Sequence, residues 1–233
     1  MPWFRRFKRA LPGPFTFLLI VGSAASLQAQ ASPSGLNTLN FLFGAGVQLS
    51  KSSDAKPVPL ETHSVLASGD RIKFFLAPQS DANFYLFHEG ADGRVALLYP
   101  ADIDESRLAA GRLVYVPKGS LWFELDAASG AEKFLFLASH ERLARLEDLA
   151  ARHAADKERG GPASSAKELL DEISRLNKSY RSLAAPAEMP VRIAGKFRAP
   201  PKADSTPLPD ITPFAKEITA KDFYSKTFTI DHR

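Results

Sequence analysis

Residues 68–100 decide the fold, and they read SGDRIKFFLAPQSDANFYLFHEGADGRVALLYP. The stretch contains three short apolar runs, at 72–76, 84–87 and 95–99, which are separated by clusters of turn-forming residues. Short runs of aromatic and branched residues bounded by Gly, Pro, Asp and Asn are typical of strands in an antiparallel meander. The Asp92-Gly93 pair predicts a tight hairpin between the second and third runs, because such a turn requires positive φ angles.

The first two runs differ in their two faces. In the first, a period of two places Ile72, Phe74 and Leu76 on one face and Arg71, Lys73 and Phe75 on the other. The second run, over 84–87, is apolar on both faces, which predicts that both of its faces are covered by other elements.

Further strands follow the meander. We expect them over 112–116, 121–125 and 133–138, with a first strand near 47–49, an edge strand near 191–194 and a last strand over 223–230. About seven to nine strands at this spacing predict a mainly β fold, specifically an antiparallel sandwich.

The period of the apolar pattern changes after the last of the central strands. With Ser139 as the expected N-cap, Leu143, Leu146 and Leu149 form one helical stripe. Ser165 and Glu168 then match a capping box, which predicts the start of a second amphipathic helix. Together these patterns predict an appended α-helical hairpin whose apolar stripes pack on the doubly apolar strands.

Residues 1–31 carry the signals of an exported protein. Four basic residues within positions 5–9 precede an apolar run over 15–21, and small residues follow as far as Ala31. This order is typical of a cleaved secretory signal peptide. The apolar run is also too short for a spanning helix, which needs about 20 residues. We therefore expect a periplasmic or secreted protein with no membrane span after signal cleavage.

The composition narrows the classes of partner and cofactor. The net charge of +4 falls to zero on cleavage, because residues 1–29 hold four basic and no acidic side chains. A neutral mature chain does not support binding to nucleic acid. Since the chain has no cysteine, a lipobox cysteine, a thiol nucleophile and a Cys-ligated metal are excluded.

These patterns divide the chain into four parts. They are a signal peptide at 1–31, a β-sandwich domain at 36–140, a helical hairpin at 141–184 and a Pro-rich extended segment at 185–233. The last part holds seven of the 17 prolines, and its C-terminal strand is expected to return to the sheet.

Several ordered motifs resemble one protein family. They are Ser68-Gly69-Asp70-Arg71-Ile72, Phe84-Tyr85-Leu86-Phe87, Asp92-Gly93, Leu97-Leu98-Tyr99-Pro100 and the run from Gly130 to Ser139. Over roughly residues 58–149 the chain resembles the bacterial domain of unknown function DUF4384. The resemblance implies a β-rich, exported or surface-located module, and it supplies no catalytic residues.

No catalytic pattern stands out among the polar residues. The five histidines, at positions 63, 88, 140, 153 and 232, make no metal-binding pair, so we interpret them as solvated or capping residues. Ser164 and Lys167 fit Ser-x-x-Lys but lack its companion motifs, which favours an ordinary helix N-terminus. A Gly-x-Ser-x-Gly elbow and a phosphate loop are absent from the sequence.

An acidic cluster at Asp102, Asp104 and Glu105 lacks the spacing of a calcium loop and is interpreted as a solvated loop. We therefore predict no cofactor and no metal.

Five residues remain as tentative binding residues: Asp70, Arg71, Tyr85, Tyr99 and Trp122. Aromatic residues beside an arginine are the usual composition of a protein-binding hot spot. The alternative is structural, with Gly69-Asp70 as a turn and the aromatics in the core.

The sequence thus leads us to expect a non-enzymatic binding or structural module of the cell envelope, with a protein or a cell-wall component as its partner. The alternative is an exported hydrolase whose active site the sequence does not reveal.

Overall fold

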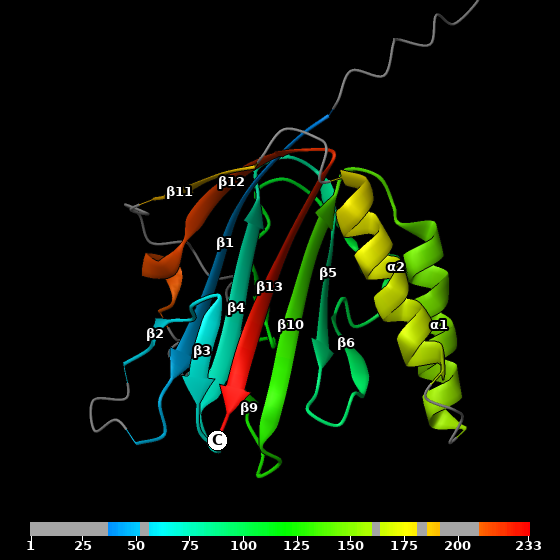
Figure 1. Ribbon diagram of the computed structural model, residues 1–233. Helices are drawn as coiled ribbons and strands as arrows, with labels where there is room; N and C mark the ends of the chain where they lie inside the picture. The colour runs from blue at the N-terminus through cyan, green and yellow to red at the C-terminus, as the bar shows by residue number, and fades with distance from the viewer. Residues whose placement is uncertain (1–36, 52–55, 160–163, 181–185, 192–209) are drawn as a thin grey trace, which may run out of the picture. The chain divides into compact units, whose positions relative to one another are not determined.

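A computed structural model describes residues 37–51, 56–159, 164–180, 186–191 and 210–233 (Figure 1). The expected signal peptide lies outside these residues, as do the turn between the two predicted helices and much of the Pro-rich segment. Within the described residues the fold is mainly β, with thirteen strands in two sheets and a pair of α-helices. The predicted sandwich with its helical hairpin is therefore confirmed, although it has more strands than expected.

One sheet has seven strands, with the order β11-β12-β1-β4-β8, and with β2 and β9 pairing at the ends of β1 and β4. Its strands are β1 (Thr38–Gln48), β2 (Val58–Pro59), β4 (Arg71–Pro78), β8 (Val114–Val116), β9 (Phe123–Glu124), β11 (Ala187–Pro190) and β12 (Lys216–Lys221).

The other sheet has six strands, with the order β3-β13-β10-β5-β6, and β7 also pairs with β5. Its strands are β3 (His63–Leu66), β5 (Ala82–Glu89), β6 (Val95–Tyr99), β7 (Arg107–Leu108), β10 (Gly130–Ser139) and β13 (Phe223–His232). The C-terminal strand β13 lies between β3 and β10, and its pairing with β3 is parallel. The last strand is thus an interior member of the sheet, as Figure 1 shows.

The main core fills the space between the two sheets. Ile72, Phe74 and Leu76 of β4 face Phe84 and other residues of the six-stranded sheet in one buried cluster. Phe228 and Ile230 of the last strand belong to the same cluster, as their alternation predicts. This layer is rich in aromatic rings, and Phe43 of β1 stacks on Phe136 of β10 with ring centroids 4.1 Å apart.

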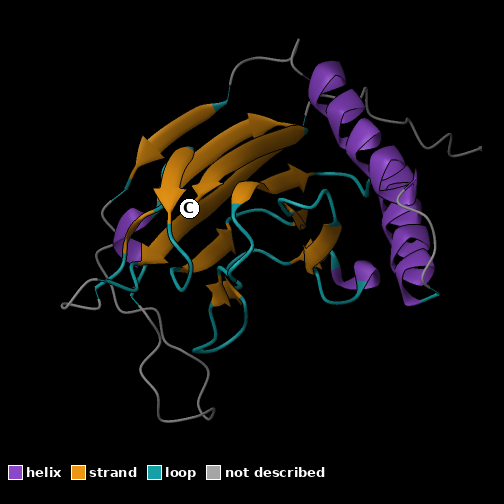
Figure 2. Ribbon diagram, turned by 60° about the horizontal axis from the view of Figure 1, so that its bottom comes forward, coloured by secondary structure: helices purple, strands orange, loops and turns teal. Residues whose placement is uncertain are grey.

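The helical hairpin consists of α1 (Ala144–Glu158) and α2 (Ser164–Tyr180), which cover the outer face of the six-stranded sheet (Figure 2). Tyr85 and Phe87 of β5 form a second buried cluster there with Leu146 of α1 and Ile173 of α2. The prediction that this strand is covered on both faces is therefore confirmed. Burying apolar side chains contributes about 25 cal/mol per Å², so the hairpin is held to the sheet mainly by its apolar stripes.

Two predictions are wrong: the bounds of the first strand and the N-cap of the first helix. The first strand was expected near 47–49, but it runs from Thr38 to Gln48 and continues through Gly44 and Gly46. A Cβ atom at Gly44 would lie 2.1 Å from the ring of Phe75, so the missing side chain makes room for that ring on the outer face. Ser139 does not cap a helix, because it is the last residue of β10 and α1 begins only at Ala144.

Two more differences concern the later elements. Ser165 lies inside α2, which begins at Ser164, so the predicted capping box does not open that helix. The edge strand near 191–194 is replaced by β11 (Ala187–Pro190), and residues 192–194 lie outside the described part of the chain. The strand β12, which pairs with β1, was not predicted.

Candidate functional site

Asp70 closes the turn between β3 and β4. One carboxylate oxygen accepts hydrogen bonds from the N–H and the hydroxyl of Ser50, at 2.7 and 2.9 Å, and the other accepts from the N–H of Ala67 at 2.9 Å. Burial by itself would raise the pKa of Asp70, but these hydrogen bonds outweigh it and lower the pKa. All the contacts of this carboxylate serve the turn, which is the structural alternative for Asp70.

Arg71 lies on the surface directly after this turn. Its Nε donates to Glu124 of β9 at 2.9 Å, and about half of each side chain is exposed. The two residues are also paired in register across β4 and β9. Arg71 is thus available at the surface, although its charge already has a partner.

Tyr99 and Trp122 lie on different sides of the seven-stranded sheet. Tyr99 is buried in the core between the sheets, where burial raises its pKa to about 12. Trp122 is half-buried on the outer face of the sheet, in the cluster around Phe75. The two aromatic side chains therefore cannot contribute to one binding surface.

Lys73 is a buried cation beside Trp122. Its side chain is 0% exposed, and its ammonium group donates to the carbonyl oxygens of Pro117, Gly119 and Leu121. The ammonium also lies 5.6 and 5.7 Å from the ring centroids of Tyr115 and Trp122. Burial lowers the pKa of Lys73 to about 8. All three donors of the ammonium have acceptors, so the residue fastens the loop between β8 and β9.

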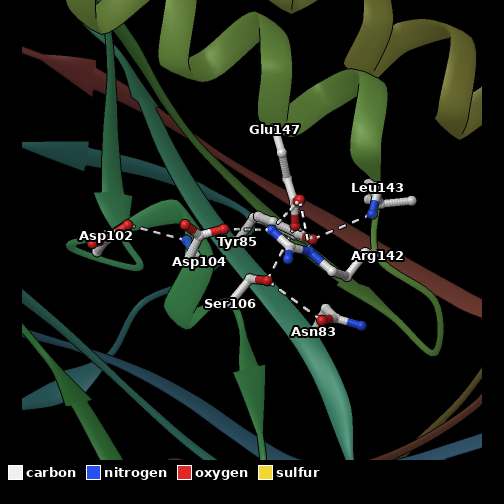
Figure 3. A network of polar contacts seen from close by, with 8 residues as sticks. All are labelled: Asn83, Tyr85, Asp102, Asp104, Ser106, Arg142, Leu143 and Glu147. Carbon is white, nitrogen blue, oxygen red and sulfur yellow. Dashed lines mark hydrogen bonds and ion pairs between the residues drawn. The ribbon is translucent and has the colours of Figure 1, made fainter. Parts of the chain in front are cut away.

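Tyr85 takes part in a buried polar network between β5 and the start of α1 (Figure 3). Its hydroxyl donates to Glu147 at 2.6 Å and accepts from the N–H of Leu143 at 3.3 Å. Burial, together with the hydrogen bond to the carboxylate, raises the pKa of Tyr85. A tyrosine with both hydrogen-bonding functions occupied and no exposed surface does not reach a ligand.

The same carboxylate joins the sheet, a loop and the helix. Glu147 also accepts from the hydroxyl of Ser106 at 3.1 Å and from the guanidinium of Arg142 at 2.7 Å. Arg142 in turn contacts Asp104 of the predicted acidic cluster at 3.0 Å. Figure 3 shows the guanidinium between the two carboxylates. The network is complete in itself and fixes the helical hairpin to the sheet.

Another buried carboxylate, Glu132 of β10, is held by two imidazoles. Nε2 of His88 lies 2.6 Å from one carboxylate oxygen, and Nδ1 of His232 lies 2.8 Å from the other. Because a carboxylate only accepts, both of these ring nitrogens carry hydrogen. His232 is 2% exposed, so the interpretation of the histidines as solvated or capping residues is wrong for this one.

The chain of contacts continues from His232 to the surface. The second ring nitrogen of His232, Nε2, lies 3.1 Å from Oγ of Ser68. In a neutral imidazole whose Nδ1 carries the hydrogen, Nε2 is an acceptor, so the Ser68 hydroxyl donates to it. Ser68, His232 and Glu132 are therefore hydrogen-bonded in the order hydroxyl, imidazole, carboxylate. Ser68, at the outer end of this series, is exposed.

A cavity of about 330 Å³ lies beside this series of hydrogen bonds. His88, Glu132 and Phe134 belong to its lining, together with Leu98 and Phe123. Leu98, Phe123 and Phe134 are the apolar part of the lining, and its exposed charged residues, which we call the rim, are Asp92, Arg94, Glu124, Asp126 and Lys157. Ser68 and His232 do not line it, so Glu132 is shared between the cavity and the serine-bearing turn.

The alternation of residues in the sequence could have identified Glu132 and its two histidines as buried polar residues. His88, Glu132 and His232 lie at core-facing positions of three neighbouring strands, β5, β10 and β13. In each strand the preceding core-facing residues are apolar, such as Phe134 and Phe136 in β10. A polar residue that continues an apolar alternation is unusual, because a buried polar group needs a partner. Only the order of the strands shows that these three meet.

Neither a metal cluster nor a membrane-spanning helix occurs among the described residues. No group of three or more His, Asp or Glu side chains there is arranged to hold a metal ion. None of the helices in the described ranges is long and apolar enough to cross a membrane.

Comparison with known proteins identifies one part of the chain. Searches of curated proteins and of solved structures returned no match. A family model described as domain of unknown function (DUF4384) matches residues 65–142, which run from the end of β3 through β10 to the residues before α1. The turn with Ser68, the strand with His88 and the strand with Glu132 lie inside the match, whereas His232 lies outside it. The chain is thus similar to the DUF4384 family over residues 65–142.

Proposed function

We propose that this protein is an exported binding module of the bacterial cell envelope, and that it holds a partner in the cavity beside His88. The observation that carries the proposal is the cavity itself, with its apolar floor and charged rim. Ligand sites are typically concave and mostly apolar, with a few polar groups placed to fix orientation. Export rests on the basic and apolar signals in residues 1–31 of the sequence.

A protein partner fits the lining better than a cell-wall glycan. The aromatic residues of the floor, Phe123 and Phe134, are half-buried and buried, so they do not present open ring faces on which sugars could stack. A pocket of about 330 Å³ accepts one or two side chains of a bound segment. Its charged rim, which contains Asp126 and Lys157, can then pair with polar groups around them.

The charges of the rim are largely compensated within the protein. Asp92 pairs with Arg94 at 3.1 Å, and Glu124 pairs with Arg71 at 2.9 Å. Pairs of this kind contribute little stability and can exchange partners on binding. Arg71 therefore contributes to the proposed binding surface indirectly, through its ion pair with Glu124, which lines the cavity.

The test uses site-specific photo-crosslinking in the exporting cell. A photoreactive amino acid is placed at Ala128, which is exposed and lines the cavity, and a matched control is placed at Ala151, which is exposed on α1. We expect one crosslinked protein species from position 128 and none from position 151. An added Ala96→Arg substitution fills the cavity and should remove that species, whereas Ala151→Arg should not.

Other outcomes contradict the proposal. Equal crosslinking from both positions would show that the cavity is not the binding surface. A crosslinked product that carries glycan and no second protein would identify the cell wall as the partner instead. The absence of any product from position 128 would remove the support for a binding module.

A further inference from the structure

We propose that Ser68 is a nucleophile for acyl transfer, with His232 as its base and Glu132 as the residue that positions the base. This inference goes beyond binding in the cavity and departs from the expectation that the protein is not an enzyme. It takes up the alternative of an exported hydrolase. The class of substrate is an unhindered carboxylic ester that reaches the surface turn at Ser68.

The distances have the order that this chemistry requires. The Ser68 hydroxyl lies 3.1 Å from Nε2 of His232, and Nδ1 of His232 lies 2.8 Å from Glu132. A serine is a weak nucleophile until an adjacent base takes its proton, and the base is in turn oriented by a third group. Such an arrangement is recognised by geometry and roles rather than by sequence position. The chain order here is serine, glutamate and histidine, on a β-sandwich.

The three residues differ in their exposure to solvent, as the proposed reaction requires. Ser68 is exposed, whereas Glu132 and His232 are buried. His88 holds the other oxygen of Glu132 at 2.6 Å, so the carboxylate cannot turn away from His232. A buried carboxylate without a lysine or arginine partner is costly. The turn at Ser68 does not need a buried imidazole and carboxylate for its stability. A nucleophilic serine does need them, as its base and as the group that positions the base.

The turn that carries Ser68 is rigid. The N–H of Asp70 donates to the carbonyl of Ala67 at 3.0 Å, and Gly69 has a φ of 85°, which is the conformation of a type II turn with Ser68 at its first corner. The N–H of Gly69 is bonded to the carbonyl of Leu125 at 2.8 Å. A reactive group on a rigid support keeps the geometry that its reaction needs.

A donor for the oxyanion is available at the same residue. Within the described ranges, the backbone N–H of Ser68 has no hydrogen-bond acceptor, unlike those of Ala67, Gly69 and Asp70. The N–H of a nucleophilic serine is one of the donors that stabilise the tetrahedral intermediate in serine hydrolases. Ser68 therefore combines an activated hydroxyl with a free N–H.

The proposed reaction is balanced without any cofactor. Ser68 Oγ attacks the ester carbonyl carbon as its proton passes to Nε2 of His232, and a C–O bond to Ser68 forms. The intermediate collapses with cleavage of the bond to the alcohol, which takes the proton from His232. Water then attacks the acyl-serine with His232 as the base, the bond to Ser68 breaks, and a carboxylic acid is released.

The first test is covalent labelling of the folded full-length mature protein with a fluorophosphonate. We expect a single adduct by intact-mass measurement and its location on Ser68 by peptide mapping. Ser68→Ala should lose the adduct, and Ser64→Ala, a matched serine on β3, should keep it. An adduct elsewhere, or no adduct on Ser68 in protein with an unchanged melting temperature, overturns the proposal.

The second test measures the hydrolysis of p-nitrophenyl acetate. Ser68→Ala and His232→Ala should each slow it by at least about 100-fold. Because His232 is buried and its replacement also removes packing within the sheet, the decision rests on Ser68→Ala, at an exposed position. Hydrolysis by Ser68→Ala at the rate of the parent protein overturns the proposal.

Glu132 acts through His232, so its test needs a readout that packing alone would not change. Glu132→Gln should move the acid limb of the pH–rate profile to lower pH, because the imidazolium loses its carboxylate partner. Glu132→Asp should restore the parent profile in part. An unchanged profile in folded Glu132→Gln removes the positioning role. These outcomes are independent of crosslinking at Ala128, which probes the cavity alone.

Discussion

Two buried carboxylates lie on opposite faces of the six-stranded sheet, and they are held in different ways. Glu147 is 6% exposed and is bound by a tyrosine, a serine and the guanidinium of Arg142. Glu132 is 5% exposed and is bound by two imidazoles. One partner of Glu147 carries a permanent positive charge, whereas both partners of Glu132 are imidazoles, which carry no permanent charge.

The difference indicates what each carboxylate does. A buried charge next to an arginine is compensated at every physiological pH, so Glu147 suits a structural connection between helix and sheet. Imidazoles can exchange protons with a neighbouring hydroxyl, so Glu132 suits chemistry at Ser68 or a response to a ligand. The surroundings of the two carboxylates support this assignment, because Glu147 is enclosed by the hairpin whereas Glu132 lines a cavity.

The largest expected effect concerns Glu147. Its replacement by alanine leaves the buried hydroxyl of Tyr85 without its acceptor and removes the buried partner of Arg142, so we expect the free energy of unfolding to fall by about 3 kcal/mol. Urea denaturation measures this loss. Glu141→Ala, at an exposed neighbouring position, should change it by no more than about 0.5 kcal/mol. Equal effects of the two substitutions would show that the network does not hold the hairpin.

The next effect concerns Lys73, a buried charge whose partners are all neutral carbonyl groups. Its pKa is about 8 in the folded protein and 10.5 in the unfolded chain, so between these values the unfolded state binds more protons. The free energy of unfolding should therefore rise with pH in this window, by about 2 kcal/mol from pH 8 to pH 10.

The measurement compares the parent protein with Lys73→Met. Tyrosines such as Tyr85 and Tyr99, whose pKa values burial raises, destabilise both proteins equally above pH 10, so the difference isolates Lys73. A difference that is flat between pH 8 and pH 10 would mean that the three carbonyl groups keep the ammonium charged.

A smaller loss of stability is expected for Glu132→Gln. The amide keeps the shape of the side chain, and each imidazole can change its tautomer to meet a new donor or acceptor. We expect a fall of about 1 kcal/mol in the free energy of unfolding. A loss as large as that of Glu147→Ala would remove the contrast between the two carboxylates and mark Glu132 as structural.

The smallest effect should come from Asp104, the exposed end of the Glu147 network. The side chain of Asp104 is 78% exposed, and its carboxylate pairs with Arg142 at 3.0 Å (Figure 3). Because salt screens exposed pairs, Asp104→Asn should lower the melting temperature slightly at low salt and not at all in 1 M NaCl. An effect that persists at high salt would mean that Asp104 belongs to the buried part of the network.

Most strands could be predicted, because each is encoded by its own alternation. The faces of β4 and the double coverage of β5 followed from the spacing of Ile72, Phe74, Tyr85 and Phe87. The turn before β6 followed from Asp92-Gly93, although only Gly93 has a positive φ. Most of β1 was missed, because the reasons for its two glycines lie far away in the chain: Gly44 makes room for the ring of Phe75, and a side chain at Gly46 would collide with Ile211.

The candidate site could not be predicted in the same way. Ser68, Glu132 and His232 are spread over the length of the chain, and no local motif connects them. Of the tentative binding residues, Arg71 remains at the surface, Trp122 is half-buried, and Asp70, Tyr85 and Tyr99 are buried. Composition identified aromatic strands correctly, but the same residues form a core or a binding face, depending on what packs over them.

The sequence by itself determined the class of fold, the hairpin and the DUF4384 resemblance, because these depend on period, composition and order along the chain. The tertiary structure alone decided which polar residues meet. It inserts β13 between β3 and β10, and this brings His232 to Glu132 and to the turn of Ser68. The physical reason is that strand pairing is a long-range contact: the alternation fixes which face a side chain occupies, while the sheet order fixes its neighbours.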